Sequence, residues 1–364
     1  MRRFRPDSLF RREVRRLEPY RVTNPPHRIK LNQNESPVEL PGRVKRAIAS
    51  SLVGERWAHY PDFPPRAVAA RIARHLDLPA ETVLPGHGSN ELIYATVLVT
   101  VGKGETMLMP TPSYLLARLP ARVAGGRTVT VPLGRRFEYE PDRIVRAIQR
   151  ANPKLVFLPS PNNPTGTSLT EKAVHQIARS APHSLVLIDE AYQEFSDTDL
   201  APLVRQHSNL VLLRTLSKAF RLAGFRIGYL LGSPELLARI ELGKPPHSVD
   251  RLSQVAVPAV LESYEVIQKG VRRVVRERER VSRALSNITG VDVFPSQANF
   301  LLFRVPVGSQ AYEGLLSRGI LVRNVGEGAG ADKRLAGCLR VTIGTKKEND
   351  AFLSALSAHL KERT

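Results

Sequence analysis

Cysteine is nearly absent from this chain of 364 residues, which contains only Cys338. A single thiol excludes a disulfide within the chain and a zinc cluster built on cysteines, and it fits a reducing compartment. No apolar run reaches the roughly 18–20 residues needed to cross a bilayer. The arginine-rich beginning of the chain has no apolar centre of the signal-peptide type. We therefore expect a cytoplasmic protein with no membrane partner.

Acidic residues are also scarce: 34 Asp and Glu stand against 54 Lys and Arg, which gives a net charge of +20. Such an excess raises the hypothesis of nucleic-acid binding. The run Arg272–Arg280 keeps valines among its charges, which is typical of the solvated face of a long helix. Because the chain has no helix-turn-helix, zinc-finger or RNP-like motif, we expect no nucleic-acid partner. A basic surface would instead help to attract phosphorylated substrates.

Apolar residues make up 42% of the chain, enough for a large core and for two domains. Short apolar runs alternate with amphipathic stretches such as Asp142–Arg150 and Glu171–Arg179. The expected strands are Thr106–Met109, Thr128–Pro132, Leu155–Leu158, Leu185–Ile188, Leu210–Leu213 and Ile227–Leu231. This alternation predicts an α/β domain with a mostly parallel sheet. In such sheets, ligands bind beyond the carboxyl ends of the strands.

The last third of the chain has a different pattern. A long helical stretch runs from Asp250 to Asn287, and further strands are expected at Val291–Phe294, Asn299–Val305, Ile320–Arg323 and Leu339–Ile343. This predicts a smaller α+β domain at the C-terminal end. We therefore expect an N-terminal arm over 1–40, a large α/β domain over 41–250, and a connecting helix with the small domain over 251–364.

The segment TLSKAFRLAGFRIGY contains the first candidate for chemistry. Lys218 follows an expected strand, and a buried lysine near another cation loses its proton easily and forms a Schiff base. Thr215 and Ser217 precede it, and Arg226 comes eight residues later. Two hydroxyls, a lysine and an arginine so close together indicate a phosphate group beside an imine. A purely structural loop is the alternative for this segment alone.

A carboxylate follows another expected strand, in LVLIDEAYQEF. Asp189 stands where α/β enzymes place catalytic groups, and a carboxylate beside a pyridine nitrogen keeps that nitrogen protonated. Tyr192, three residues later, is placed to reach a ring hydroxyl. The alternative is that Asp189 only caps the start of a helix.

Three shorter segments suggest further contacts. SPNNPTG, at 160–166, holds Asn163 in a turn at the sheet edge. LPGHGSNELI, at 84–93, lets Ser89 or Asn90 open a helix, whose N-terminus is suited to an anion. Tyr114, in MPTPSYLLA, is an aromatic residue suited to stacking on a flat ring. Taken singly, each segment is equally typical of an ordinary turn or of core packing.

Together, NNPTG, DEAY, TLSKAFRLAGFRIGY and LRVTIG, in this order and spacing, resemble the fold-type I aminotransferases, which use pyridoxal 5'-phosphate. Within that fold the chain is similar to the histidinol-phosphate aminotransferases. The similarity rests on PY at 19–20, LNQNESP at 31–37, YPD at 60–62, GSNELI at 88–93 and GCLRVTIGT at 337–345, and it spans roughly residues 18–355.

The resemblance implies a role for each matching cofactor residue. Lys218 would hold the cofactor as a Schiff base and move the proton, and Asp189 would pair with the pyridinium nitrogen. The other implied cofactor contacts are Asn163 and Tyr192 for the ring hydroxyl, Tyr114 for stacking, and Ser89, Asn90, Thr215, Ser217 and Arg226 for the phosphate. Tyr60 would reach the cofactor phosphate of the neighbouring subunit in a homodimer. No metal is implied.

The resemblance also implies the substrates. Arg340 would bind the carboxylate of glutamate, and Arg340, Arg323 and Tyr20 together would bind the phosphate of histidinol phosphate. Planar, always charged guanidinium groups can accept a carboxylate and a phosphate in turn. The expected reaction moves an amino group from L-histidinol phosphate to 2-oxoglutarate in histidine biosynthesis. The alternatives are an aminotransferase for aromatic or other amino acids and a pyridoxal-phosphate-dependent decarboxylase of a phosphorylated amino acid.

Overall fold

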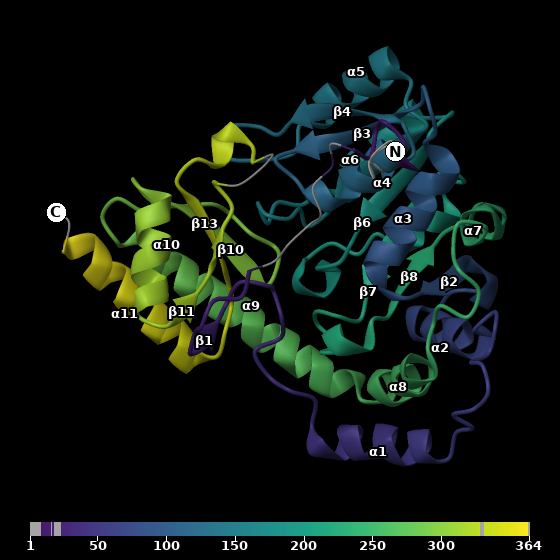
Figure 1. Ribbon diagram of the computed structural model, residues 1–364, viewed down its shortest axis with the longest axis horizontal. Helices are drawn as coiled ribbons and strands as arrows, with labels where there is room; N and C mark the ends of the chain where they lie inside the picture. The colour runs from purple at the N-terminus through teal and green to yellow at the C-terminus, as the bar shows by residue number, and fades with distance from the viewer. Residues whose placement is uncertain (1–8, 16, 18–22, 328–330, 363–364) are drawn as a thin grey trace, which may run out of the picture.

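The computed structural model describes residues 9–15, 17, 23–327 and 331–362. Its centre is a seven-stranded sheet with the order β2-β8-β7-β6-β5-β3-β4 (Figure 1). The strands are β2 (Val83–Gly86), β3 (Thr106–Thr111), β4 (Arg127–Pro132), β5 (Leu155–Pro159), β6 (Leu185–Asp189), β7 (Leu210–Thr215) and β8 (Gly228–Leu231). β8 runs antiparallel to both of its neighbours, β2 and β7, and all other strand pairs of this sheet are parallel. The expected mostly parallel sheet is confirmed.

Helices cover both faces of this sheet. Successive side chains of a strand point to opposite faces, so a central strand buries side chains on both sides. In β5, Leu155 and Phe157 pack with the helices on one face, and Val156 and Leu158 pack with those on the other. One face is covered by α3 (Gly88–Thr100), α4 (Arg118–Val123) and α7 (Pro234–Glu241). The other is covered by α2 (Arg66–Leu76), α5 (Pro141–Ala151), α6 (Glu171–Ser180) and α8 (Arg251–Glu262), and α1 (Gly42–Val53) lies against α8.

The long helical stretch expected from Asp250 to Asn287 is two helices. α8 ends at Glu262, and α9 covers Tyr264–Ser286, so a single residue, Ser263, separates them. Ser263 has φ −99° and ψ 23°, which interrupts the regular helix. The Asp250 side chain caps the start of α8 by accepting a hydrogen bond from the backbone N–H of Ser253 at 2.8 Å.

Beyond α9, an antiparallel sheet has the order β12-β13-β10-β9. Its strands are β9 (Asp292–Val293), β10 (Phe300–Arg304), β12 (Arg323–Asn324) and β13 (Cys338–Thr342), and α10 (Gly308–Ser317) and α11 (Lys346–Lys361) accompany it. The single strand expected over Ile320–Arg323 was wrong. Its first two residues form β11 (Ile320–Leu321), which pairs in parallel with β1 (Ile29–Lys30), Val322 belongs to no strand, and only Arg323 joins β13.

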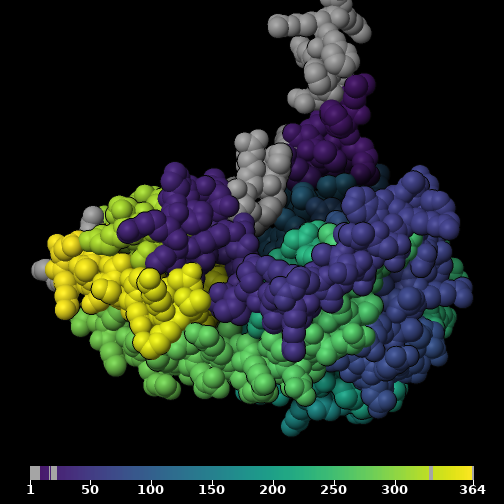
Figure 2. Space-filling model, turned by 90° about the horizontal axis from the view of Figure 1, so that it is seen from below, coloured from purple at the N-terminus to yellow at the C-terminus, as the bar shows by residue number. Residues whose placement is uncertain are grey.

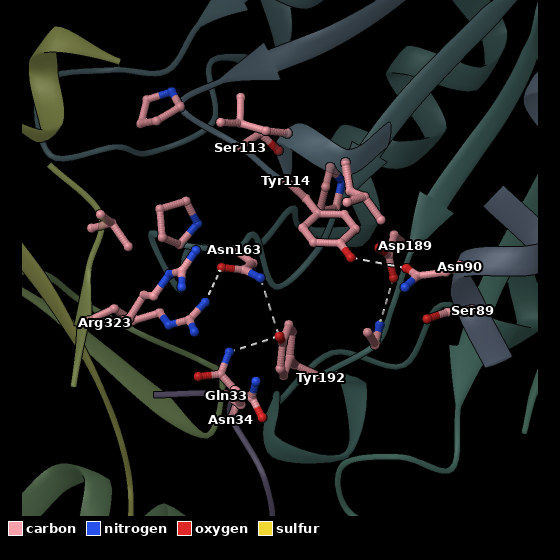
Figure 3. A pocket seen from close by; sticks show the side chains of 18 of the residues that line it. Gln33, Asn34, Ser89, Asn90, Ser113, Tyr114, Asn163, Asp189, Tyr192 and Arg323 are labelled. Carbon is pink, nitrogen blue, oxygen red and sulfur yellow. Dashed lines mark hydrogen bonds between the residues drawn. The ribbon is translucent and has the colours of Figure 1, made fainter. Parts of the chain in front are cut away.

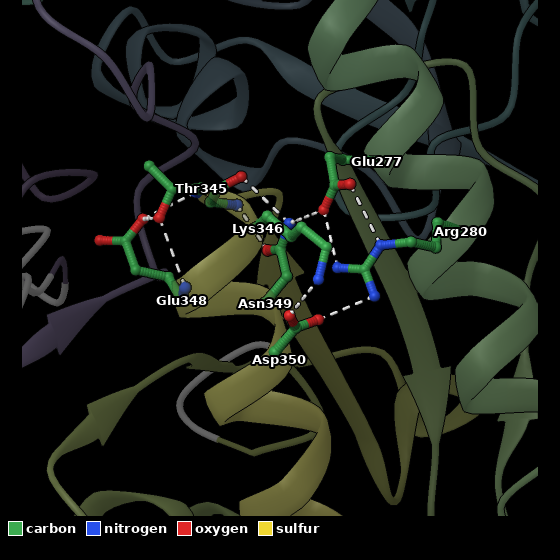
Figure 4. A network of polar contacts seen from close by, with 8 residues as sticks. Glu277, Arg280, Thr345, Lys346, Glu348, Asn349 and Asp350 are labelled. Atoms are coloured by element: carbon green, nitrogen blue, oxygen red, sulfur yellow. Dashed lines mark hydrogen bonds and ion pairs between the residues drawn. The ribbon is translucent and has the colours of Figure 1, made fainter.

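A polar network fixes α11 on α9 (Figure 4). The amide nitrogen of Asn349 donates to Glu277 at 2.9 Å, and Arg280 bridges Glu277 and Asp350 with two contacts of 2.8 Å. Thr345 and Glu348 form a capping box at the start of α11. The C-terminal helix is therefore anchored by side chains as well as by apolar packing.

The N-terminal segment links the two sheets. After β1 it crosses the surface between the C-terminal part of the chain and the large sheet, as Figure 2 shows in purple. The backbone N–H of Asn34 donates to the Thr342 hydroxyl at 2.9 Å. The domain limits expected at residues 40 and 250 stay predictions. Within the described part of the chain, no helix combines the length and the apolarity that a membrane span requires.

Candidate active site

A cleft of about 1250 Å³ opens beyond the carboxyl ends of β5, β6 and β7. The structure brings most of the predicted site residues to its wall: Ser89, Asn90, Tyr114, Asn163, Asp189, Tyr192, Thr215, Ser217, Lys218, Arg226, Arg323 and Arg340. Tyr60 lies on the surface instead, with 80% of its area exposed. Tyr20 lies outside the described residues. The convergence follows from the parallel sheet, whose strand ends meet at one edge.

Lys218 comes three residues after the end of β7. Its amine donates a hydrogen bond to the backbone carbonyl of Gln33 at 3.0 Å. Burial, followed by the positive charge of Arg340, lowers the pKa of this amine to about 8, although Glu35 opposes the shift. A larger share of neutral amine is therefore present near neutral pH than for an ordinary lysine, and the neutral amine is the nucleophile.

Asp189 is the last residue of β6 and is only 7% exposed. Its carboxylate accepts a hydrogen bond from the backbone N–H of Ala191 at 3.1 Å. Burial raises the pKa of this carboxyl to about 7. The alternative role as a helix cap fails, because only the short 3-10 turn Gln193–Phe195 follows, and Tyr192 occupies its N-cap position. A desolvated carboxylate in a cleft is suited to a cationic partner such as a pyridinium nitrogen.

Tyr192 and Asn163 form a polar side of the cleft (Figure 3), and the Lys218 amine lies 6.0 Å from the centre of the Tyr192 ring. The Tyr192 hydroxyl accepts hydrogen bonds from the side-chain amides of Asn34 at 2.9 Å and Asn163 at 3.5 Å. The carbonyl oxygen of Asn163 accepts one from Arg340 at 2.6 Å. Sequence reasoning gave no role to Asn34, although LNQNESP had marked its segment. Its contact with Tyr192 shows that the N-terminal segment helps to build the site.

The start of α3 forms an anion cradle with the loop after β7. Arg226 donates to the Ser217 hydroxyl at 3.3 Å, and the Thr215 hydroxyl donates to the same oxygen at 2.9 Å. Gly88, with φ +76°, begins α3, and a Cβ placed on it would lie 2.5 Å from the Arg226 guanidinium. Only glycine leaves room there for the guanidinium beside the helix N-terminus. Backbone N–H groups, hydroxyls and an arginine match the needs of a phosphate.

Tyr114 is fixed from the side of α3, since its hydroxyl donates to the side-chain oxygen of Asn90 at 3.0 Å. Figure 3 shows its ring on the same side of the cleft as Asn90 and Asp189. The cleft therefore offers a lysine amine, a buried carboxylate, an aromatic ring and a phosphate cradle. This donor set fits pyridoxal 5'-phosphate, with its aldehyde, ring nitrogen, aromatic face and phosphate.

Arg323 and Arg340 form a second cationic group, away from the phosphate cradle. They are direct cross-strand neighbours on β12 and β13. Arg340 is 8% exposed and donates to the backbone carbonyl of Asn32 at 2.6 Å. Arg323 points into the cleft (Figure 3) and has no hydrogen-bond or ion-pair partner among the described residues. The cleft thus contains separate places for two anionic groups.

Known proteins that are similar to this chain include many aminotransferases. The family model for aminotransferase class I and II matches residues 26–356. A histidinol-phosphate aminotransferase of Chlorobium phaeovibrioides is 43% identical over 331 residues, which cover 91% of each chain. One from Ruminiclostridium cellulolyticum is 35% identical over 97% of this chain and 98% of its own.

Among solved structures, the histidinol-phosphate aminotransferase of Sinorhizobium meliloti in complex with pyridoxal 5'-phosphate matches with a TM-score of 0.85. It is 24% identical, and the match covers 100% of this chain and 99% of the other, which supports the fold. The chain therefore belongs to the class I and II aminotransferases, which are pyridoxal-phosphate-dependent transaminases of fold type I, and within them to the histidinol-phosphate aminotransferase group.

Proposed function

We propose that this enzyme transfers the amino group of L-histidinol phosphate to 2-oxoglutarate and so produces imidazole-acetol phosphate and L-glutamate, a step of histidine biosynthesis. The observation that carries the proposal is the pair Arg323 and Arg340, which lines the cleft apart from the phosphate cradle. A transaminase with a pair of guanidinium groups in its cleft besides the phosphate cradle is suited to substrates that carry their own anion.

The chain's own residues account for the steps expected of a transaminase. Bound pyridoxal phosphate supplies an electron-accepting ring that weakens the C–H bond of the amine-bearing carbon. The Lys218 amine would take up that proton and pass it to the cofactor carbon, since its lowered pKa is suited to a group that both accepts and releases a proton near neutral pH. Asp189 would hold the ring nitrogen protonated, and Asn163 and Tyr192 would orient the ring through its hydroxyl.

One site has to serve both half-reactions, so the donor product leaves before 2-oxoglutarate binds. Arg340 would bind the carboxylate of glutamate and 2-oxoglutarate, and Arg323 would join it, together with Tyr20, for the phosphate of the donor. Arg340 is held by Asn163 and by the carbonyl of Asn32, so its guanidinium is oriented before a substrate arrives.

We also propose a cytoplasmic homodimer without a nucleic-acid partner. The segment from 53 to 63 exposes four large apolar side chains: Val53, Trp57, Tyr60 and Phe63. Clustered exposed apolar residues mark an interaction surface. In the dimer, the Tyr60 side chain would extend across the interface and reach the phosphate cradle of the second subunit.

The visible spectrum of the purified holoenzyme tests the substrate assignment. L-Histidinol phosphate, L-glutamate and L-phenylalanine are titrated in parallel, with Lys218→Ala as the control that cannot hold the cofactor covalently. We expect the band of the lysine-bound cofactor to disappear with L-histidinol phosphate and with glutamate. A response to phenylalanine alone would move the enzyme to the aromatic aminotransferases, and release of carbon dioxide from a phosphorylated amino acid would identify a decarboxylase.

A further inference from the structure

A third cationic group in the cleft is not explained by the roles assigned above. The 3-10 turn Leu115–Ala117 and the helix α4 follow Tyr114 directly. Arg118 therefore lies four residues after Tyr114, and Arg122 lies one turn further. Both arginines line the same cleft as Lys218.

Arg118 has no hydrogen-bonded or ion-paired counter-charge within the described part of the chain, although the carboxylate of Asp332 is near enough to act on its pKa. Its Nε is buried, with less than 1 Å² of accessible area, and has no hydrogen-bond partner. The structure records no ion pair for this guanidinium among the described residues. Burial lowers the pKa of Arg118, and the charge of Asp332 only opposes that effect. A half-buried cation without a partner is costly, which favours an anionic ligand at this position.

The carboxylates near this wall are already engaged. Asp332 accepts hydrogen bonds from the Thr111 hydroxyl at 2.7 Å and from Arg334 at 2.9 Å, and these contacts hold its pKa at about 2 despite partial burial. Glu327 accepts a hydrogen bond from the side chain of Asn324 at 3.0 Å. Neither carboxylate forms an ion pair with Arg118.

Arg122 adds a second positive charge at helical spacing from Arg118, and like charges four residues apart repel each other. An anion bound between them would relieve that repulsion. The same wall carries Leu115 and Leu119, so it combines apolar surface with a cationic end. This combination matches a ligand with a flat apolar body and an anionic head.

We propose that Arg118, assisted by Arg122, forms a second anion subsite that binds the phosphate monoester of the amino donor from the α4 wall. Arg323 and Arg340 lie on β12 and β13 of the antiparallel sheet, whereas Arg118 and Arg122 lie on α4. The donor phosphate would therefore be held from two separately packed parts of the protein. Arg118 would then be a specificity-determining residue that selects phosphorylated donors over their unphosphorylated forms. This inference rests on the proposed function.

The test compares steady-state kinetics of the wild type, Arg118→Gln and Arg118→Lys holoenzymes. The donors are L-histidinol phosphate and unphosphorylated L-histidinol, and glutamate is assayed separately. We expect Arg118→Gln to lower kcat/KM for L-histidinol phosphate by roughly 10- to 100-fold, mainly through KM, because a lost charge-assisted hydrogen bond has an effect of that order. The values for L-histidinol and glutamate should stay within about twofold, and lysine should restore part of the loss. Inorganic phosphate should inhibit Arg118→Gln less than the wild type.

Arg127→Gln, an exposed arginine on β4, is the matched control for the loss of one positive charge. An equal loss for L-histidinol and L-histidinol phosphate, or no loss for either, would overturn the inference. The melting temperature of Arg118→Gln should not fall, since the replaced cation has no partner, and a clear fall would assign Arg118 to the fold instead. If the wild type fails to use L-histidinol phosphate, the proposed function is wrong and the inference falls with it. If the wild type uses that donor and Arg118→Gln uses it equally well, the inference is contradicted but the proposed function is not.

Discussion

Asp189 and Lys218 hold opposite charges in a cleft that penalises both. Burial is the largest cause of each pKa shift, upward to about 7 for the carboxyl and downward to about 8 for the amine. Desolvation disfavours the charged form of any group. Bound pyridoxal phosphate would change this situation, because Asp189 would then face the cationic ring nitrogen and Lys218 would hold the cofactor as a Schiff base. The cost of desolvation would therefore be highest in the protein without cofactor.

Replacing Asp189 by Asn should stabilise the cofactor-free protein at high pH. The folded pKa of about 7 lies above the ordinary value of 3.8 for an aspartate carboxyl. The stability that such a carboxyl contributes to the folded protein is fully present below its pKa in the unfolded chain. It is lost as the pH rises through 7. At about pH 8 we expect the free energy of unfolding of Asp189→Asn to exceed that of the wild type by up to about 4 kcal/mol. The difference should vanish near pH 4, and urea unfolding at both pH values measures it.

Glu194→Gln is the matched control. Burial also raises the pKa of the Glu194 carboxyl to about 7, and this residue is not part of the cleft wall described above. We expect it to show a similar stabilisation at high pH and to keep the visible band of the bound cofactor, which Asp189→Asn should alter. Equal stability of wild type and Asp189→Asn at about pH 8 would contradict the explanation by desolvation.

At the scale of elements, the contact of α9 with α11 depends on one buried amide. Asn349 is 1% exposed and links Glu277 on α9 with both backbone groups of Gly344. The sequence TKKE at 345–348 shows the capping box that starts α11. The partner of Asn349 on α9 lies 72 positions earlier in the chain, so no local pattern indicates it.

Asn349→Ala should reduce the free energy of unfolding by about 1–3 kcal/mol, because it leaves the buried backbone groups of Gly344 without partners. Asp350→Ala, which removes an exposed partner of Arg280 in the same network, should have a clearly smaller effect. Denaturant unfolding of the two variants measures the difference. Equal losses would show that the surface ion pairs, and not the buried amide, carry the contact.

At the scale of the whole molecule, the exposed apolar segment from 53 to 63 is the surface on which the proposed homodimer depends. Trp57 and Tyr60 are 74% and 80% exposed. Tyr60 packs at 5.0 Å, ring centroid to ring centroid, against His247. If Tyr60 belongs to the site of the second subunit, cofactor binding depends on assembly.

Trp57→Asp should produce monomers that bind pyridoxal phosphate more weakly, because a charge in the expected interface prevents the apolar contact. Light scattering should give twice the chain mass of 40.4 kDa for the wild type and a single chain mass for the variant. Val307→Asp, which changes an exposed apolar residue at the N-cap of α10, should stay dimeric. A wild type with the mass of one chain would contradict the proposed dimer.

The sequence alone determined the fold class, the cofactor and the residues at the strand ends. Lys218, Asp189 and Asn163 each follow a buried apolar run, and parallel strands bring their carboxyl ends to one edge. Such residues are readable because the signal is local: an apolar run, a turn and one chemical group.

Only the tertiary structure decided which distant residues complete the site. The contact of Asn34 with Tyr192 and that of Arg340 with the carbonyl of Asn32 join positions 158 and 308 residues apart. The division of Ile320–Arg323 between two sheets and the burial of the unpartnered Arg118 Nε depend likewise on segments far along the chain. Periodicity and turn residues report local conformation, whereas burial, pairing and pKa shifts arise when separate segments pack together.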